Sequence, residues 1–130
     1  MVGMKDILVP ISPGELLDKI TILRIKAARM TDAIKLENVR LELQLMEQTW
    51  RDSGCGVFAE DEQALQAVNE QLWVVEDLIR EKEAARSFDS EFIELARSVY
   101  IANDERAAIK KRVNTRLGSR IVEEKSYKPY

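Results

Sequence analysis

An apolar stripe that contains an arginine constrains the fold of this chain more than any other sequence feature. Near the C-terminus apolar residues repeat every three or four positions, at Phe92, Leu95, Val99, Ala102, Ile109, Val113 and Leu117. This period is typical of a helix that packs along one face. The position that completes the series is Arg106. A guanidinium in a packed seam needs a carboxylate or a bound anion, because burying an unpaired charge is very unfavourable.

Three further segments show the same helical period and have recognisable ends. Their apolar stripes are Leu16, Ile20, Leu23, Ala27 and Met30, then Leu36, Val39, Leu43, Met46 and Trp50, then Leu65, Val68, Leu72, Val75 and Ile79. Ser12, Asp32 and Asp89 are suitable N-caps, Glu15 completes a capping box with Ser12, and Gly54 and Gly118 are suitable C-terminal stops. We therefore predict helices at about 13–30, 32–53, 61–85 and 89–117, within a single helical domain spanning 1–130.

The pattern predicts an all-α fold with two possible arrangements. Four helices with short connections form either a four-helix antiparallel bundle or paired helical hairpins. Short extended arms are expected at both ends, because residues 6–11 are apolar and β-branched with Pro10 among them, and residues 120–124 also favour an extended chain. These arms are expected to pair, within one chain or between two. The long apolar helices 32–53 and 89–117 favour a homodimer.

Composition excludes several classes of function. The chain has no histidine and one cysteine, Cys55, which excludes Ser-His and Cys-His catalysis, His-ligated metals and an internal disulfide. A net charge of −3 argues against general nucleic-acid binding. There is no long apolar run and no signal-peptide pattern, so we expect a cytoplasmic protein without membrane contact.

Charge is unevenly distributed along the chain. Residues 97–130 hold nine Lys/Arg against four Asp/Glu, although the whole chain is acidic. A basic last helix on an acidic body indicates an anion site or self-association. We expect the run Lys110–Arg112, with Arg116 and Arg120, to be solvated. The acidic run Glu60–Glu62 is expected to favour its helix through the dipole.

Polar residues gather beside Arg106 in the predicted pattern. Tyr100, Asn103, Lys110 and Asn114 share its strip of the helix 89–117, and Asn69, Trp73 and Glu76 lie on the helix 61–85. Such a patch is suited to a small anionic ligand, a phosphate or carboxylate, or to a partner protein. Glu76 is the expected partner of Arg106, which then braces the patch while Asn103, Lys110 and Asn114 contact the ligand. Trp73 is either a stacking platform or, more commonly for such a residue, part of the core.

An alternative interpretation concerns four carboxylates. Glu15, Asp18, Glu76 and Asp77 have the oxygen chemistry that Mg²⁺ prefers, and together they would suit a Mg²⁺-dependent hydrolase of a phosphorylated substrate. This alternative requires at least three of them to converge on one ion. Otherwise no cofactor is expected, because acidic residues in a first helical turn are already explained by capping and the helix dipole.

Four segments resemble a known family. The segments PISPGELLDKITIL from Pro10, VNEQLWVVED from Val68, ARSVYIANDERA from Ala96 and VEEKSY from Val122 are similar to a family of small uncharacterised bacterial proteins, a domain of unknown function. The resemblance implies an association with surface-polysaccharide and glycosyltransferase functions, and it implies no activity. The family's recurrent polar positions correspond here to Glu15, Asp18, Lys19, Asn69, Trp73, Glu76, Tyr100, Asn103, Arg106, Lys110 and Asn114.

Three hypotheses of function remain from the sequence. The first is a non-enzymatic binding or interaction module that uses the polar patch. The second is the Mg²⁺-dependent hydrolase. The third is an architectural assembly protein in which the polar seam specifies which helices pair. None of them identifies a substrate, ligand or pathway.

Overall fold

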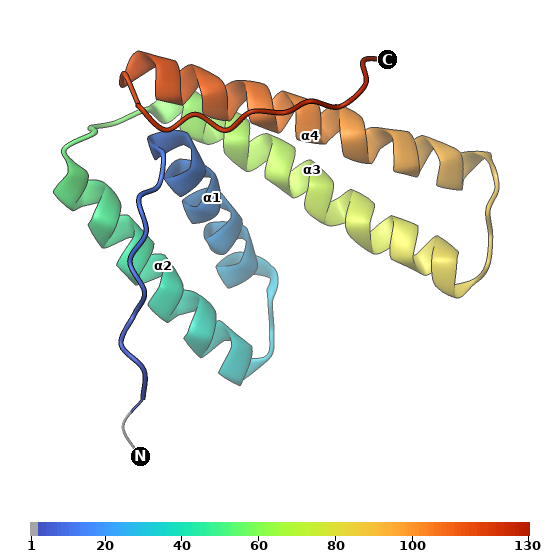
Figure 1. Cartoon of the computed structure of the whole chain (residues 1–130). Coiled ribbons are helices and arrows are strands. Elements are labelled where there is room, and N and C mark those ends of the chain that lie inside the picture. Colours follow the sequence, from blue (N-terminus) through green and yellow to red (C-terminus); the bar gives the residue numbers. More distant parts are fainter. Residues whose placement is uncertain (1–2) are drawn as a thin grey trace.

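The computed structural model describes residues 3–130 and contains four helices within them (Figure 1). They are α1 (Pro13–Arg29), α2 (Ala33–Ser53), α3 (Ala59–Ala84) and α4 (Ser90–Arg116). No strand occurs in this part of the chain, so the all-α prediction is confirmed. The predicted helix ends differ from the observed ones by at most two residues, the largest difference being the earlier start of α3.

The helices form paired hairpins rather than a closed bundle. Helices α1 and α2 pack against each other, and so do α3 and α4. Helix α1 also packs against both α3 and α4, whereas α2 contacts no described helix except α1. The two hairpins therefore meet at α1 and diverge away from it (Figure 1). Of the two predicted arrangements, the structure has the paired helical hairpins.

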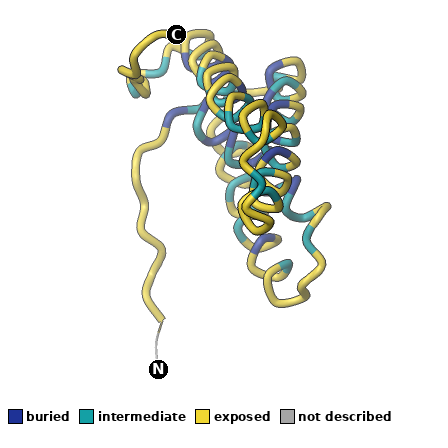
Figure 2. The backbone as a smooth tube through the Cα atoms, turned by 90° about the vertical axis from the view of Figure 1, so that its right-hand side faces the viewer, coloured by how far each residue is buried: buried dark blue, intermediate teal, exposed yellow. Residues whose placement is uncertain are grey.

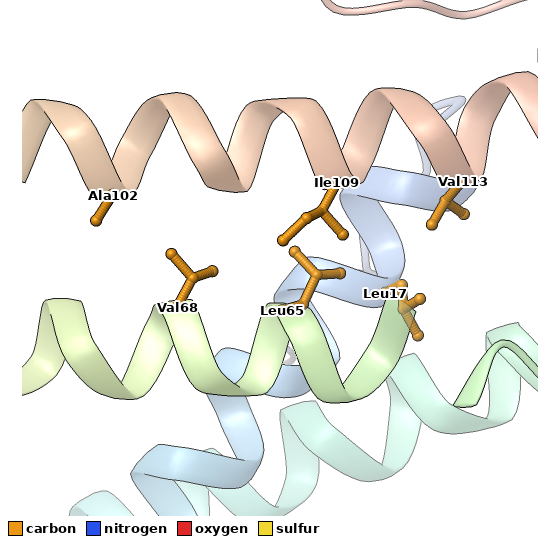
Figure 3. Packing of buried hydrophobic residues seen from close by; sticks show 6 residues of the cluster. All are labelled: Leu17, Leu65, Val68, Ala102, Ile109 and Val113. Carbon is orange, nitrogen blue, oxygen red and sulfur yellow. The ribbon is translucent and has the colours of Figure 1, made fainter. Parts of the chain in front are cut away.

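The core lies where α1 crosses the α3–α4 hairpin (Figure 3). Leu65 and Val68 of α3 face Ala102, Ile109 and Val113 of α4, and Leu17 of α1 completes the cluster; all six side chains are buried. Full burial of an aliphatic side chain of this size contributes roughly 1.5–3 kcal/mol. This cluster fixes the position of α1 against the last helix, and thereby the position of the polar residues described below.

The predicted caps are present with one change. The side chains of Ser12, Asp32 and Asp89 accept hydrogen bonds from backbone N–H groups of the first turns of α1, α2 and α4, at 3.2, 3.0 and 3.0 Å. Gly54 ends α2 with φ 73°, a conformation that only glycine adopts without strain. The capping box is different, because the Glu15 carboxylate binds Lys110 on α4.

The two arms do not pair with each other within the chain. Residues 3–12 and 119–130 contain no strand, so the predicted pairing inside one chain is wrong. The C-terminal tail, residues 119–130, instead runs back along α4 (Figure 1). The N-terminal arm, residues 3–11, is exposed over its whole length and stands away from the helices (Figure 2).

Within residues 3–130, no helix combines the length and the apolar character that crossing a bilayer requires.

A close approach between α1 and α4 depends on Gly14. Its backbone N–H donates to Asn114 Oδ1 at 2.7 Å, and both residues are buried. A Cβ atom at position 14 would collide with the Lys110 carbonyl oxygen and would lie 2.9 Å from Asn114 Oδ1. Because the colliding atom belongs to a helix backbone, only a shift of α1 relative to α4 would relieve the contact.

We predict that Gly14→Ala lowers the free energy of unfolding by about 1–3 kcal/mol, the usual effect of overpacking a tight contact. Urea denaturation followed by circular dichroism measures it. Gly3→Ala is the control, because a Cβ atom there meets nothing within 4 Å and leaves stability unchanged. Equal stability of the Gly14→Ala variant and the parent protein would show that the α1–α4 contact is looser than described.

Candidate functional site

A buried polar junction joins α1, α3 and α4 beside the core. Asn69 Nδ2 donates to Asp18 Oδ1 at 2.8 Å and lies 3.0 Å from Thr21 Oγ1, and the Thr21 hydroxyl donates to the Asp18 carbonyl oxygen at 2.7 Å. Asp18, Thr21 and Asn69 are all buried. Throughout residues 3–130, every buried side-chain nitrogen or oxygen has a hydrogen-bond partner. The junction is therefore fully paired, as burial of polar groups requires.

Arg106 completes this junction, but not with the expected partner. Its Nη1 donates to Asn69 Oδ1 at 3.4 Å, and its Nε lies 4.0 Å from Asp18 Oδ2. The predicted pairing with Glu76 is wrong, because Glu76 binds Arg80 one turn along α3 at 3.3 Å. Helix α1 inserts its Asp18 into the seam between α3 and α4, so the carboxylate that faces Arg106 comes from a third helix.

Lys110 lies one turn further along α4 and contacts two carboxylates. Its Nζ is 2.5 Å from Glu15 Oε2 on α1 and 3.2 Å from Glu123 Oε2 in the tail. Burial by itself would lower the pKa of Lys110, but the hydrogen bonds to Glu15 and Glu123 and the nearby charges outweigh it and raise the pKa above 10.5. The ammonium group is therefore charged at neutral pH.

The tail and α4 enclose a groove of about 710 Å³. Four cationic side chains line it, Arg106, Lys110, Lys125 and Lys128, together with Asn103 and the rings of Tyr100, Tyr127 and Tyr130. The Tyr130 hydroxyl donates to Asp104, and its ring packs edge-on against Tyr100 with 5.1 Å between centroids. These contacts hold the end of the tail to α4. We call this space the tail groove.

Arg106 also lines a smaller hollow. It measures about 340 Å³ and is lined by Ile22, Ile25, Asn69, Leu72, Trp73, Glu76, Asp77, Asn103 and Arg106. Trp73 is half-buried at its wall, so the expectation that it belongs to the core is only partly met. Asn103 and Arg106 are thus shared by both hollows, whereas Tyr100 and Lys110 face the tail groove alone.

Asn114 is not a ligand-contacting residue of the tail groove, contrary to the expectation from the sequence. It is buried at the α1–α4 contact, where it binds the Gly14 backbone, and it does not line the tail groove.

The four carboxylates of the hydrolase alternative are also placed differently from the expectation. Within residues 3–130, no three carboxylate, cysteine or histidine side chains gather where they could hold a metal ion. Glu15, Asp18, Glu76 and Asp77 therefore do not form the shared Mg²⁺ site that the hydrolase alternative requires.

A second buried carboxylate, Asp61, was not predicted from the sequence. Its side chain is only 2% exposed, and Arg112 and Arg116 of α4 each approach it at 2.9 Å. Both arginines were expected to be solvated, and their side chains are about half exposed, at 48% and 51%. A signal was present, because Asp61 lies one turn before Leu65 and extends the apolar stripe of α3. This cluster joins the start of α3 to the end of α4.

The chain matches a known family of proteins. A family model with the description "Family of unknown function (DUF6165)" matches residues 7–130, which include all four helices, the polar junction and the tail groove. Comparisons with curated proteins and with solved structures give no match.

We predict that Asp61→Asn lowers the free energy of unfolding by about 1–3 kcal/mol, because two charge-assisted hydrogen bonds lose their acceptor charge. Urea denaturation measures the change. Glu60→Gln is the matched control, since it removes the neighbouring exposed charge at the same helix start and should cost no more than about 0.5 kcal/mol. An equal decrease in the free energy of unfolding in both variants would mean that Asp61 stabilises the protein only through its interaction with the dipole of α3.

A second prediction concerns the attachment of the tail. Hydrogen bonds from Lys125 and Lys110 lower the pKa of Glu123 to about 2 from its ordinary 4.5. A lowered folded-state pKa means that the carboxylate stabilises the attachment above pH 4.5, and that this contribution disappears as the pH falls toward 2. NMR titration of the Glu123 carboxyl group measures it. In Lys110→Gln the pKa should rise part of the way back, since Lys125 remains, and an unchanged pKa would contradict the contact.

Proposed function

Since the chain belongs to this family of unknown function, we propose a function from the site itself: the protein binds a small anionic ligand in the tail groove. The ligand carries a phosphate or carboxylate group that binds Arg106 and the neighbouring lysines. The protein is a binding module rather than an enzyme.

The observation that carries this proposal is that the Arg106 guanidinium makes few polar contacts, and that these contacts are long. A guanidinium has five N–H donors, and in residues 3–130 Arg106 makes two polar contacts, at 3.4 and 4.0 Å, both near the limit for such interactions. Its side chain is 29% exposed and lines two hollows. The buried Asp18–Asn69 pair orients the group, while most of its donors stay available for an anion.

The remaining lining of the tail groove supports the same ligand chemistry. Lys110 is charged and fixed in position by Glu15, and Lys125 and Lys128 add positive charge from the tail. The three tyrosine rings offer flat apolar surface for the uncharged part of a ligand. A volume of about 710 Å³ suits a molecule larger than a free phosphate ion.

The carboxylates in the groove favour binding over catalysis. Asp104 accepts from Tyr130, and Glu123 is paired with both Lys110 and Lys125. The hydrogen bonds from Lys125 and Lys110 lower the pKa of Glu123, which makes this carboxylate a weak general base. The groove therefore combines ligand-orienting groups with engaged acids, which is the chemistry of a binding site.

Two other functions, binding of a partner protein and an architectural role, are alternatives to this proposal. A partner protein with an acidic segment would use the same cationic lining. An architectural role would need only the buried junction and no ligand. The predicted link to surface-polysaccharide biosynthesis, together with the predicted bacterial and cytoplasmic setting, makes sugar phosphates and nucleotide sugars sensible compounds to test.

We predict that sugar phosphates, nucleoside diphosphates or nucleotide sugars raise the melting temperature, with inorganic phosphate and pyrophosphate as simpler probes. A ligand at 100 times its Kd adds about 2.7 kcal/mol of stability. Differential scanning fluorimetry identifies the ligand, and isothermal titration calorimetry gives its Kd. Arg106→Gln, which keeps a donor for Asn69, should weaken binding about tenfold or more, the usual effect of losing a charge-assisted hydrogen bond.

Arg97→Gln is the matched control, because Arg97 lies on the same helix, is exposed and does not line the tail groove. It should leave the Kd unchanged. Equal weakening by both variants would indicate a general charge effect and contradict the site. Failure of every anion to raise the melting temperature would remove the small-ligand proposal and leave the partner protein or the architectural role.

A further inference from the structure

The carboxylate of Glu123 in the tail lies between two ammonium groups. Its Oε2 is 3.2 Å from Lys110 Nζ on α4, and its Oε1 is 3.0 Å from Lys125 Nζ in the tail. All three side chains line the tail groove. The two lysines therefore flank a position that fits one oxyanion group, and the chain itself supplies the anion. We call this place the two-lysine position.

Lys110 is fixed in place without the help of the tail. Its side chain is only 10% exposed, and Glu15 of α1 binds the same ammonium group. This contact keeps Lys110 at the groove whether or not Glu123 is beside it. Arg106 lies one helical turn earlier on the same face of α4 and also lines the groove. Helix α4 therefore presents two cations to the groove independently of the tail.

Glu123 is held much less firmly than Lys110. Its side chain is 43% exposed, and residues 122–130 are exposed throughout. In the described part of the chain, no backbone hydrogen bond joins this segment to α4 (Figure 1). The far end of the tail is attached separately, by the contact of the Tyr130 hydroxyl with Asp104. The Glu123 carboxylate can therefore turn from Lys110 into water, at little cost for an exposed ion pair, while the tail stays attached.

An internal carboxylate at this position selects among external anions. A group tethered to the same chain competes at an effective concentration on the order of millimolar. A free carboxylate would replace the contacts of Glu123 with identical ones and would lose its translational and rotational freedom. A phosphate group instead brings nearly two negative charges and three acceptor oxygens. The exchange is therefore favourable for a phosphate group and unfavourable for a carboxylate.

We propose that the two-lysine position is a phosphate subsite, which Glu123 occupies until a phosphate group of the ligand displaces it. The displaced carboxylate turns to water, and both lysines then bind the phosphate oxygens. Arg106, one turn earlier on α4, faces the same ligand. This inference rests on the proposed function and narrows its ligand to a phosphorylated molecule. Glu123 is then the residue that excludes carboxylate ligands from the groove.

Isothermal titration calorimetry with inorganic pyrophosphate tests the displacement. Glu123→Gln removes the internal competitor, so the Kd for pyrophosphate should fall about three- to tenfold. Glu124→Gln is the matched control, because Glu124 is the next carboxylate of the tail, is exposed and does not line the groove. It makes the same change in net charge and should leave the Kd unchanged. Malonate, a dicarboxylate, should bind the parent chain about tenfold more weakly than pyrophosphate, and Glu123→Gln should reduce this difference.

NMR of the Glu123 carboxyl group provides the second measurement. Saturating pyrophosphate should return the pKa of Glu123 from about 2 toward its ordinary 4.5, because the hydrogen bonds from Lys125 and Lys110 that lower it are lost. The circular dichroism of the Glu123→Gln variant should match that of the parent chain, since the tail lies outside the hydrophobic core.

The outcomes separate this inference from the proposed function. If Arg106→Gln weakens pyrophosphate binding but Glu123→Gln leaves it unchanged, the anion site stands and the displacement is wrong. An equal gain from Glu123→Gln and Glu124→Gln would indicate a general charge effect and would also overturn the displacement. If neither the parent chain nor Glu123→Gln binds pyrophosphate, the phosphate subsite is wrong, whereas a carboxylate that raises the melting temperature would still support the proposed function. Binding by Glu123→Gln alone would support the subsite and show that Glu123 closes it to pyrophosphate.

Discussion

The structure depends on the packing of α1 against both helices of the α3–α4 hairpin. Helix α1 contacts each of the other three helices, whereas α2 packs against α1 alone among the described helices. The close approach is possible because residue 14 has no Cβ atom and its N–H binds Asn114 across the contact. Leu17, one turn later, enters the core between α3 and α4. Gly14 and Leu17 thus both contribute to the way in which the two hairpins meet.

The same packing places Arg106 at the edge of the buried polar junction. Helix α1 carries Asp18 into the seam, and a buried carboxylate needs donors, which Asn69 and Arg106 supply. The contact between Asp18 and Arg106 is long, so it orients the guanidinium but leaves most of its N–H donors available. Its remaining donors are therefore available at the two hollows that it lines. In the proposed function, the side chain that completes the buried junction also binds the anion.

The two ends of the chain differ because their side chains differ. The tail carries Glu123, Lys125 and Tyr130, which find charged and aromatic partners on α4 or within the tail itself. The arm is mostly apolar and extended, and it projects from a rigid cap at Ser12. Polar and aromatic contacts attach the tail within its own chain, whereas the arm stands clear of the helices (Figure 2).

The sequence by itself determined the four helices, the side-chain caps of α1, α2 and α4, and the place of Arg106 in the packed stripe of α4. Periodicity and capping depend on residues within a few positions of each other, so local patterns suffice to predict them. Only the tertiary structure decided that Asp18, rather than Glu76, faces Arg106, that Asp61 is buried between Arg112 and Arg116, and that the tail closes a groove. These contacts depend on which helices cross and at what depth. The crossing of the helices is set by the packing of side chains that are far apart in the sequence and by the close approach at Gly14. No local sequence pattern encodes this crossing.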